Sequence, residues 1–209
     1  MENVLVVGAN GTTGKKIVNL LKASQYFNPI AMVRIEEQKE QFKKENISTV
    51  LGDLEKDLSH TVENIDKVIF AAGSGGKKVI AVDQEGAKNL MKASKKANIK
   101  KFVMLSSMGA DNPKSSKDLQ EYLEAKHNAD EYLKSSELTY AIVRPGSLTN
   151  DAGTGKIELN SKLGKQGAIT RDDVAQTLVR SLHDNAAINQ TFEIIQGDTL
   201  IGKAMDKIA

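Results

Sequence analysis

The sequence predicts an α/β protein with a doubly wound, mainly parallel sheet of seven strands and helices on both faces. Seven short apolar runs recur between amphipathic stretches, and a glycine-rich turn joins the first run to the first amphipathic stretch. Strands that alternate with helices imply right-handed crossovers and therefore a parallel sheet. Ligands of such sheets bind at the carboxyl ends of the strands, so functional residues are expected there.

The predicted strands are apolar on both faces, as expected for strands that helices cover on both sides. They span residues 4–7, 30–33, 49–51, 68–72, 102–105, 140–143 and 192–195. The predicted helices span residues 14–24, 36–45, 79–97, 117–135 and 172–182. No repeat or linker interrupts the 209 residues, so we expect one domain over residues 1–209.

Composition and charge narrow the class of protein. The 29 basic and 27 acidic residues leave a net charge of +2, too little to steer the protein to nucleic acid or an anionic membrane. Aromatic residues make up 4% of the chain and cysteine is absent, which disfavours nucleic-acid stacking and excludes disulfides and thiolate metal sites. We expect a cytoplasmic protein without a signal peptide or membrane span, and a small-molecule substrate. The oligomeric state stays open.

The turn after the first predicted strand has the spacing GxxGxxG, formed by Gly8, Gly11 and Gly14. Gly8 permits a tight turn, Gly11 lets backbone N–H groups approach phosphate oxygens, and Gly14 lets the helix lie against the strand. The free N–H groups at the start of that helix favour a diphosphate. An isolated motif of this kind can also be a turn without a ligand. Here a clear strand pattern precedes the motif and a clear helix pattern follows it, which favours a bound dinucleotide.

Two positions further along indicate which dinucleotide binds. Arg34 ends the second predicted strand, where NAD sites carry an acidic residue for the ribose 2′-hydroxyl; a guanidinium suits a 2′-phosphate instead. NADP(H) is therefore favoured over NAD(H), with a surface arginine as the alternative and Glu36 and Glu37 nearby. Asp53, just past the third strand, is placed equally well to bond an adenine amino group or to stabilise a turn.

Small residues end the fourth predicted strand, in Ala71-Ala-Gly-Ser-Gly-Gly76, and would let a flat cofactor pass close to the backbone; a flexible turn is the alternative. Residues 147–169 are rich in glycine and show little periodicity, which predicts an irregular substrate loop. Thr170 is expected to cap the next helix, with Asp173 in its first turn. Catalysis by Asp172 and Asp173 is the less favoured interpretation.

The predicted helix 117–135 contains Tyr122 and Lys126, whose spacing puts a phenol and an ammonium on one helix face. A nearby ammonium stabilises a phenolate and so suits a tyrosine for acid/base chemistry. The alternative is an ordinary surface pair. Ser106 and Ser107 end the fifth predicted strand, where one hydroxyl can bond a substrate carbonyl or alkoxide; Ser107 is the preferred residue.

These pieces together resemble the atypical short-chain dehydrogenase/reductases, specifically the compact NAD(P)-binding group with GxxGxxG. The resembling pieces are Val7-Gly-Ala-Asn-Gly-Thr-Thr-Gly14, Met32-Val-Arg34, Gly52-Asp-Leu54, Leu105-Ser-Ser-Met-Gly109, Tyr122-Leu-Glu-Ala-Lys126, Val143-Arg-Pro-Gly146 and Arg171-Asp-Asp-Val-Ala175. An asparagine that conventional members use in a proton relay has no clear counterpart. Asn89 lacks the matching spacing.

The resemblance implies a Rossmann fold with NADP(H) on the glycine loop, Tyr122 as proton donor, Lys126 as its electrostatic partner and Ser107 as holder of the substrate carbonyl. The implied cofactor-binding residues are Gly8, Asn10, Gly11, Thr12, Thr13, Gly14, Arg34, Asp53, Leu54, Ala71, Ala72, Gly73, Ser106, Lys126, Pro145 and Gly146. The histidines at 60, 127 and 183 are far apart, and no metal site is expected.

The sequence therefore favours an NADPH-dependent oxidoreductase that reduces a small carbonyl, quinone or similar acceptor, with Tyr122 as proton donor. One alternative is an NAD(P)-dependent epimerase or dehydratase that acts on a sugar-like substrate. Another is a non-catalytic NADP(H) redox sensor that binds a protein partner. The identity of the substrate is not readable from the sequence.

Overall fold

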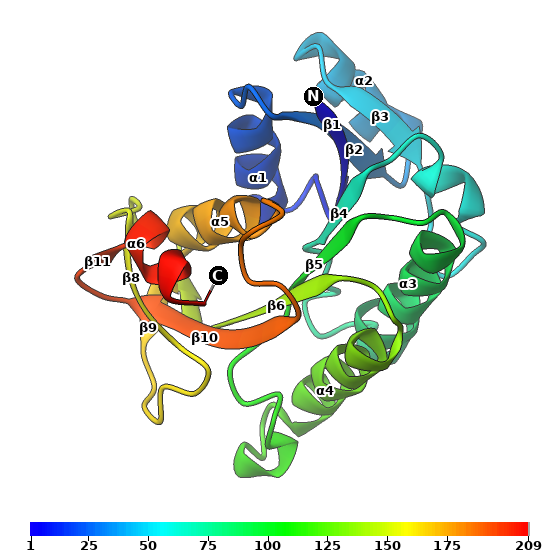
Figure 1. Ribbon diagram of the computed structural model, residues 1–209. Coiled ribbons are helices and arrows are strands. Elements are labelled where there is room, and N and C mark those ends of the chain that lie inside the picture. The colour runs from blue at the N-terminus through cyan, green and yellow to red at the C-terminus, as the bar shows by residue number, and fades with distance from the viewer. Residues whose placement is uncertain (209) are drawn as a thin grey trace.

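The computed structural model describes residues 1–208, and within them the strands and helices alternate over most of the chain (Figure 1). In chain order the strands are β1 (Glu2–Val7), β2 (Phe27–Val33), β3 (Ser48–Leu51), β4 (Lys67–Phe70), β5 (Lys101–Leu105), β6 (Tyr140–Pro145), β7 (Ser147–Thr149), β8 (Lys156–Asn160), β9 (Ala168–Thr170), β10 (Gln190–Gln196) and β11 (Thr199–Leu200). The α-helices are α1 (Thr12–Lys22), α2 (Glu36–Lys44), α3 (Ala87–Lys96), α4 (Gln120–Ser135), α5 (Arg171–Arg180) and α6 (Ile201–Met205).

Residues 1–208 build one nine-stranded sheet in the order β11-β8-β10-β6-β5-β4-β1-β2-β3. The pairs from β3 across to β10 are parallel, whereas β8 pairs antiparallel with β10 and with β11. The doubly wound, mainly parallel class is confirmed. The predicted number of seven strands was too low, because β8 and β11 extend the sheet beyond the last predicted strand.

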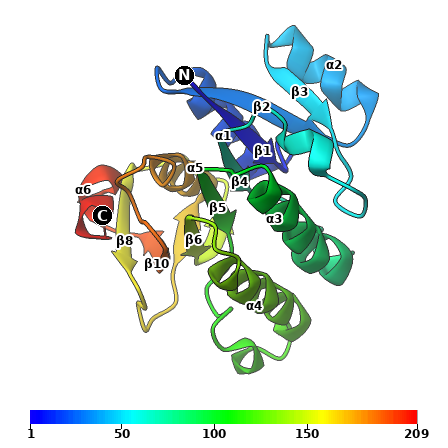
Figure 2. The ribbon, with the colours of Figure 1, turned by 45° about the vertical axis from the view of Figure 1, so that its right-hand side comes forward.

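Helices cover both faces of the sheet: α1 and α5 lie over one face, and α3 and α4 over the other (Figures 1 and 2). The residues of β1 alternate accordingly. Val4 and Val6 pack with the core under α1 and α5, and Leu5 and Val7 pack with the core under α3 and α4. All four side chains are at most 1% exposed. This two-sided burial explains why the strand sequence is apolar without alternation.

The helix α5 begins with the predicted cap. The Oγ1 of Thr170 accepts a hydrogen bond from the backbone N–H of Asp173 at 3.1 Å. The Asp173 carboxylate in turn accepts the N–H of Thr154 at 3.0 Å, and the Asp172 carboxylate pairs with Lys16 of α1 at 2.8 Å. Both carboxylates are therefore engaged in structure, which favours the capping interpretation over the catalytic one.

The glycine-rich stretch 147–169 is not irregular, contrary to the prediction. It contains β7, β8 and β9, of which β7 and β9 pair parallel in a separate two-stranded sheet. Strand β8, Lys-Ile-Glu-Leu-Asn, lies between β10 and β11 and buries Ile157 completely. Its alternating pattern is short and lies between glycines, so it does not stand out from a loop.

The predicted helix 79–97 is also divided. Its first part, η2 (Val79–Gly86), is π-helical, and α3 follows directly. A Cβ added to Gly86 would lie 2.7 Å from the Cβ of Leu54, so η2 packs tightly against the segment after β3. No helix among residues 1–208 is both long enough and apolar enough to cross a membrane.

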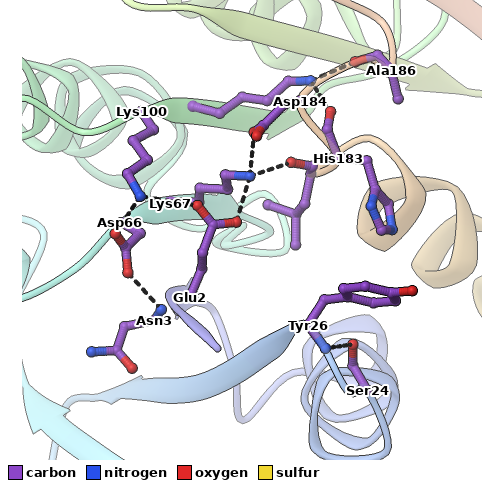
Figure 3. A network of polar contacts seen from close by, with 12 residues as sticks. Glu2, Asn3, Ser24, Tyr26, Asp66, Lys67, Lys100, His183, Asp184 and Ala186 are labelled. Carbon is purple, nitrogen blue, oxygen red and sulfur yellow. Dashed lines mark hydrogen bonds and ion pairs between the residues drawn. The ribbon is translucent and has the colours of Figure 1, made fainter.

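Two buried lysines lie at the amino-terminal edge of the sheet, and Figure 3 shows the contacts of the first, Lys67. Lys67 begins β4 and Lys101 begins β5, and each is 1% exposed. The ammonium of Lys67 donates to the Leu182 carbonyl at 2.9 Å and pairs with the carboxylates of Asp184 at 2.6 Å and Glu2 at 2.7 Å. These contacts bind the turn after α5 to the first strands.

The second lysine binds the same turn. Lys101 donates to the His183 carbonyl at 2.8 Å and to the Ala186 carbonyl. Burial, together with the positive charge of Lys67, lowers the pKa of Lys101 to about 8. Both buried ammonium groups are thus hydrogen-bonded within the protein.

Candidate active site

The glycine turn has the close approaches that its spacing predicts. Gly8 has a φ of +87°, and a Cβ added there would lie 2.7 Å from the backbone of Ala71. A Cβ added to Gly14 would lie 2.0 Å from the carbonyl oxygen of Gly8, so α1 can lie this close to β1 only with glycine there. The N–H of Gly11, which precedes the first residue of α1, donates to the Gly8 carbonyl at 2.9 Å. The positive end of α1 consequently lies beside the end of β1.

A cavity of about 740 Å³ opens at the carboxyl ends of β1, β2, β3 and β4. It lies where the strand order reverses between β1 and β4, which is the usual ligand position in a doubly wound sheet. Its volume is that of a small-molecule site. The predicted cofactor residues that line it are Gly8, Asn10, Gly11, Arg34, Asp53, Leu54, Ala71, Ala72 and Gly73.

Two polar atoms of the cavity residues have no partner among residues 1–208. The Oδ1 of Asn10 and the Oγ of Ser74 are buried, and neither makes a hydrogen bond. Buried polar groups are rarely left unpaired because the loss of hydration is costly. The sugar hydroxyls and phosphate oxygens of a dinucleotide can supply the missing partners. The residues present therefore fit a nicotinamide dinucleotide.

Arg34 lies at the rim of this cavity with its side chain exposed. Its backbone N–H donates to Oε1 of Gln38 at 3.0 Å, and Gln38 also lines the cavity. Within residues 1–208 no carboxylate pairs with the guanidinium, and the nearby Glu36 pairs with Lys39 at 3.3 Å instead. The guanidinium therefore remains available to an anionic ligand.

Asp53 serves as a turn residue and also lines the cavity. Its Oδ1 accepts the backbone N–H of Glu55 at 3.1 Å, and its Oδ2 lies 3.8 Å from Nζ of Lys56. The two interpretations of this aspartate in the sequence are thus compatible with each other. The neighbouring Leu54 is 7% exposed and packs between the cavity and η2.

A second group of predicted residues lies outside the lining of this cavity: Thr12, Thr13, Gly14, Ser106, Ser107, Tyr122, Lys126, Pro145 and Gly146. Pro145 ends β6 and Gly146 follows it, and a Cβ on Gly146 would lie 2.2 Å from the Gly167 carbonyl oxygen. The Pro145 carbonyl accepts the N–H of Met108 from the loop after β5 at 3.0 Å. The ends of β5 and β6 are therefore held together.

Tyr122 and Lys126 lie on one face of α4, as their spacing predicts. Lys126 is 3% exposed, and its Nζ lies 5.7 Å from the centroid of the half-buried Tyr122 ring. The same ammonium donates to the Leu105 carbonyl at 3.3 Å and lies 3.6 Å from Oδ1 of Asp83. A cation is thus held over the face of the tyrosine, at the end of β5.

The two serines after β5 have different environments. Ser106 is 3% exposed and donates to Oδ2 of Asp130 at 2.8 Å in the interior. Ser107 is partly exposed, and its Oγ donates only to the neighbouring Met108 carbonyl at 3.1 Å. Ser107 is therefore the hydroxyl that a substrate can reach more readily.

Asp130 and Arg144 form a buried pair that the sequence reasoning missed. The Arg144 Nε and a terminal nitrogen both lie 3.0 Å from Oδ2 of Asp130, which is fully buried. Burial raises the pKa of Asp130, and the charge of Arg144 and the hydrogen bond from Ser106 oppose that rise. An acid four residues after Lys126 and an arginine inside an apolar strand were the available signals. The pair ties α4 to the ends of β5 and β6.

The stretch 147–169 reaches the same region. Lys162, in the connection between β8 and β9, pairs with Asp111 at 2.7 Å, and Asp111 follows Ser107 by four residues. This ion pair lowers the pKa of Asp111. The stretch that the sequence assigned to substrate is therefore tied to the loop that carries Ser107.

Another missed residue is Asp83 in η2, which is 1% exposed. Its Oδ2 accepts the N–H of Ser74 at 3.0 Å, while its Oδ1 lies near Lys126. A single acid in the run Val79-Ile-Ala-Val-Asp83 was the available signal. Among residues 1–208, no three carboxylate or imidazole side chains are grouped as metal ligands would be.

Fold and cavity together define a dinucleotide-binding protein of the Rossmann type. The sequence matches the NAD(P)H-binding family over residues 8–185, and the chain belongs to that family. The predicted family and the cofactor class, NAD(P)H, are thereby confirmed.

Three relatives are similar to this chain over nearly their whole length. The "Uncharacterized sugar epimerase YhfK" of Bacillus subtilis is 38% identical over 98% of this chain and 99% of its own length. A structure of a "Putative NAD-dependent epimerase/dehydratase" from Bacillus halodurans is 39% identical with a TM-score of 0.95, covering 99% of this chain and 100% of that one. The "oxidoreductase ylbE" from Lactococcus lactis is 30% identical with a TM-score of 0.89, covering 99% and 96%.

Proposed function

We propose that the protein is an NADPH-dependent oxidoreductase that reduces a small carbonyl, quinone or similar acceptor. The observation that carries this proposal is the buried Lys126 ammonium, held 5.7 Å from the centroid of the Tyr122 ring beside the carboxyl end of β5. With Lys126 3% exposed and Tyr122 half-buried, the two residues are not the ordinary surface pair that the sequence left open. The name of the Lactococcus relative, an oxidoreductase, agrees with the proposal.

In the proposed reaction Tyr122 and Ser107 act on the acceptor oxygen, and Lys126 acts on Tyr122. When bound, NADPH supplies the hydride to the acceptor carbon. The Tyr122 hydroxyl gives its proton to the acceptor oxygen, so that a carbonyl becomes an alcohol and Tyr122 is left as tyrosinate. The Lys126 ammonium stabilises that anion, and the burial of Lys126, which is 3% exposed, strengthens the effect. Ser107 donates a hydrogen bond to the same oxygen and orients it.

The preference for NADPH is part of the proposal and rests on Arg34. Its free guanidinium at the cavity rim suits a 2′-phosphate, with Gln38 beside it. Replacing Arg34 by alanine is expected to weaken NADPH binding about tenfold or more, as the loss of a charge-assisted hydrogen bond does, and to leave NADH binding unchanged. Arg180→Ala, a change on the far end of α5, serves as the control. Equal losses for both cofactors would refute the preference.

An epimerase or dehydratase is the second candidate, because the Bacillus relatives carry these names. Such an enzyme retains its nicotinamide cofactor and shows no net oxidation of it. A cofactor that copurifies with the protein and a sugar-like substrate that is isomerised would favour this candidate.

The deciding experiment follows NADPH oxidation against a panel of quinones, flavins, aldehydes and ketones. Turnover with at least one class supports the reductase. If NADPH binds with micromolar affinity and no acceptor is reduced, the reductase proposal is wrong. A redox sensor that binds a protein partner would then be favoured.

A further inference from the structure

Asp83 is a buried carboxylate that the proposed reaction does not yet use. It is 1% exposed and lies in η2, the π-helical segment between the cavity loop and α3. A carboxylate in an apolar interior is costly unless it is paired and hydrogen-bonded. Segments of π-helix are uncommon and are frequently found at functional sites. The burial of Asp83 and its place in a π-helical segment both indicate that the position of this carboxylate matters for function.

The two oxygens of Asp83 contact two different parts of the site. Its Oδ2 accepts the backbone N–H of Ser74 at 3.0 Å. A Cβ added to Gly73 would lie 3.3 Å from its Oδ1, so the carboxylate supports the backbone of both cavity-lining residues. The same Oδ1 lies 3.6 Å from Nζ of Lys126 on α4. One side chain therefore joins the cofactor cavity to the proposed catalytic lysine.

The other charged and titratable groups around Lys126 do not replace Asp83 as its counterion. Tyr122 lies below the ammonium on α4, and β5 contributes the neutral Leu105 carbonyl. Asp130, one helical turn after Lys126, already bonds two nitrogens of Arg144 from β6. The Oδ1 of Asp130 has no partner and the charge of Lys126 also acts on Asp130, but among residues 1–208 Asp83 is the carboxylate that lies within 4.0 Å of Nζ of Lys126.

We infer that Asp83 is a positioning residue: it holds Lys126 as an ammonium over Tyr122 and holds the Gly73–Ser74 backbone against the cofactor. This inference rests on the proposed function. Two substitutions separate its two contacts. Asp83→Asn keeps an oxygen that can accept the Ser74 N–H but removes the charge that faces Lys126. Asp83→Ala removes both contacts.

For Asp83→Asn, kcat is expected to fall about tenfold and the alkaline limb of the pH–rate profile to move to lower pH, because a buried ammonium without a counterion loses its proton more readily. NADPH affinity at neutral pH should stay within about twofold of wild type, since the Ser74 hydrogen bond remains. Asp83→Ala should in addition weaken NADPH binding about fivefold, the usual loss for one hydrogen bond. Asp83→Glu should restore part of the rate.

The matched control is Glu85→Gln, which removes a negative charge from the same segment, where Glu85 pairs with Lys88 at 3.0 Å. It should change neither kcat nor the pH profile. A thermal melt of each variant verifies folding. A merely structural role for Asp83 would alter the melting temperature but not the pH profile.

The dependence of NADPH affinity on pH gives a readout that does not need turnover. Because the resemblance places Lys126 among the cofactor-binding residues, NADPH binding to Asp83→Asn should weaken more than wild-type binding as the pH is raised. This result can hold even if no acceptor is reduced, so failure of the proposed reaction and failure of this inference are distinguishable. An Asp83→Asn variant with the wild-type affinity profile, or an Asp83→Ala variant with unchanged NADPH affinity, would overturn the inference.

Discussion

Selected polar groups at the two edges of the same sheet differ in whether they have hydrogen-bond partners within the protein. At the amino-terminal edge, Lys67 and Lys101 are each 1% exposed. The ammonium of Lys67 bonds carboxylates and a backbone carbonyl (Figure 3), and that of Lys101 bonds backbone carbonyls. At the carboxyl-terminal edge, buried oxygens of Asn10 and Ser74 have no partner among residues 1–208, and the Arg34 guanidinium is exposed. The two buried lysines at one edge are paired within the protein, whereas the cavity residues at the other edge leave polar groups for a ligand.

This difference shows which polar residues serve stability and which serve binding. A buried group that is already paired gains nothing from a ligand, while a buried unpaired group lowers its free energy when a ligand bonds it. Substitutions at the amino-terminal edge should therefore change stability without changing cofactor affinity. Substitutions at the carboxyl-terminal edge should change affinity, and stability only where packing is also disturbed.

The largest combined effect on stability and cofactor affinity is expected for Gly14→Ala at the carboxyl-terminal edge. The added Cβ would lie 2.0 Å from the Gly8 carbonyl oxygen, so α1 must move away from β1. We expect unfolding free energy to fall by about 1–3 kcal/mol, as for other overpacked sites. NADPH affinity should fall tenfold or more, roughly the loss of one charge-assisted hydrogen bond. Urea unfolding and a binding titration measure both.

Gly202→Ala is the matched control, because nothing lies within 4 Å of a Cβ added there. Gly202 lies in α6, so this change should be neutral or stabilising by up to about 1 kcal/mol. Wild-type NADPH affinity in Gly14→Ala would contradict the proposed position of the diphosphate.

Lys67→Met, at the amino-terminal edge, should lower stability without changing cofactor affinity. It leaves the Leu182 carbonyl without its donor and removes the ion pairs to Asp184 and Glu2. The expected loss of unfolding free energy is about 1–2 kcal/mol, the cost of a buried carbonyl left unpaired. NADPH affinity should not change. Lys100→Met, which removes a more exposed lysine beside Glu2, should have little effect on either quantity.

A smaller effect concerns the pH dependence of stability. Burial and the charge of Lys67 lower the pKa of Lys101 to about 8, whereas an unfolded lysine has a pKa of about 10.4. Between these values the unfolded chain binds more protons than the folded one, so the contribution of Lys101 to stability rises with pH from about 8 to about 10.4 and is lost as pH falls. Urea unfolding of wild type and Lys101→Met at two pH values in that window measures the difference. Equal slopes in both proteins would contradict it.

The sequence predicted most of the parallel part of the fold, because both-face burial leaves long apolar runs such as Val4 to Val7. It missed β8, whose alternation extends over only five residues, and β11, which has only two. It also treated Val79–Gly86 as ordinary helix, since composition does not distinguish a π-helix from an α-helix. These elements depend on tertiary packing more than on local pattern.

The glycine turn and Arg34 could be read from the sequence because their roles follow from position relative to the strands. The partners of Asp83 and Asp130 could not. Asp83 meets Lys126 and Asp130 meets Arg144 only after η2, α4 and β6 have packed together. The assignments of Tyr122, Lys126 and Ser107 to catalysis remain predictions that the geometry supports.

Replacing Tyr122 by phenylalanine tests the central claim most directly, with an acceptor that the wild-type protein reduces. Loss of the proton donor should lower kcat by about 10²–10⁴-fold, while NADPH affinity stays within about twofold because the ring remains. Tyr132→Phe, a half-buried tyrosine on the same helix near Lys88 and Lys92, should retain full activity. Full turnover by Tyr122→Phe would show that another group supplies the proton and that the carboxyl-terminal edge does not carry out the proposed reaction in this way.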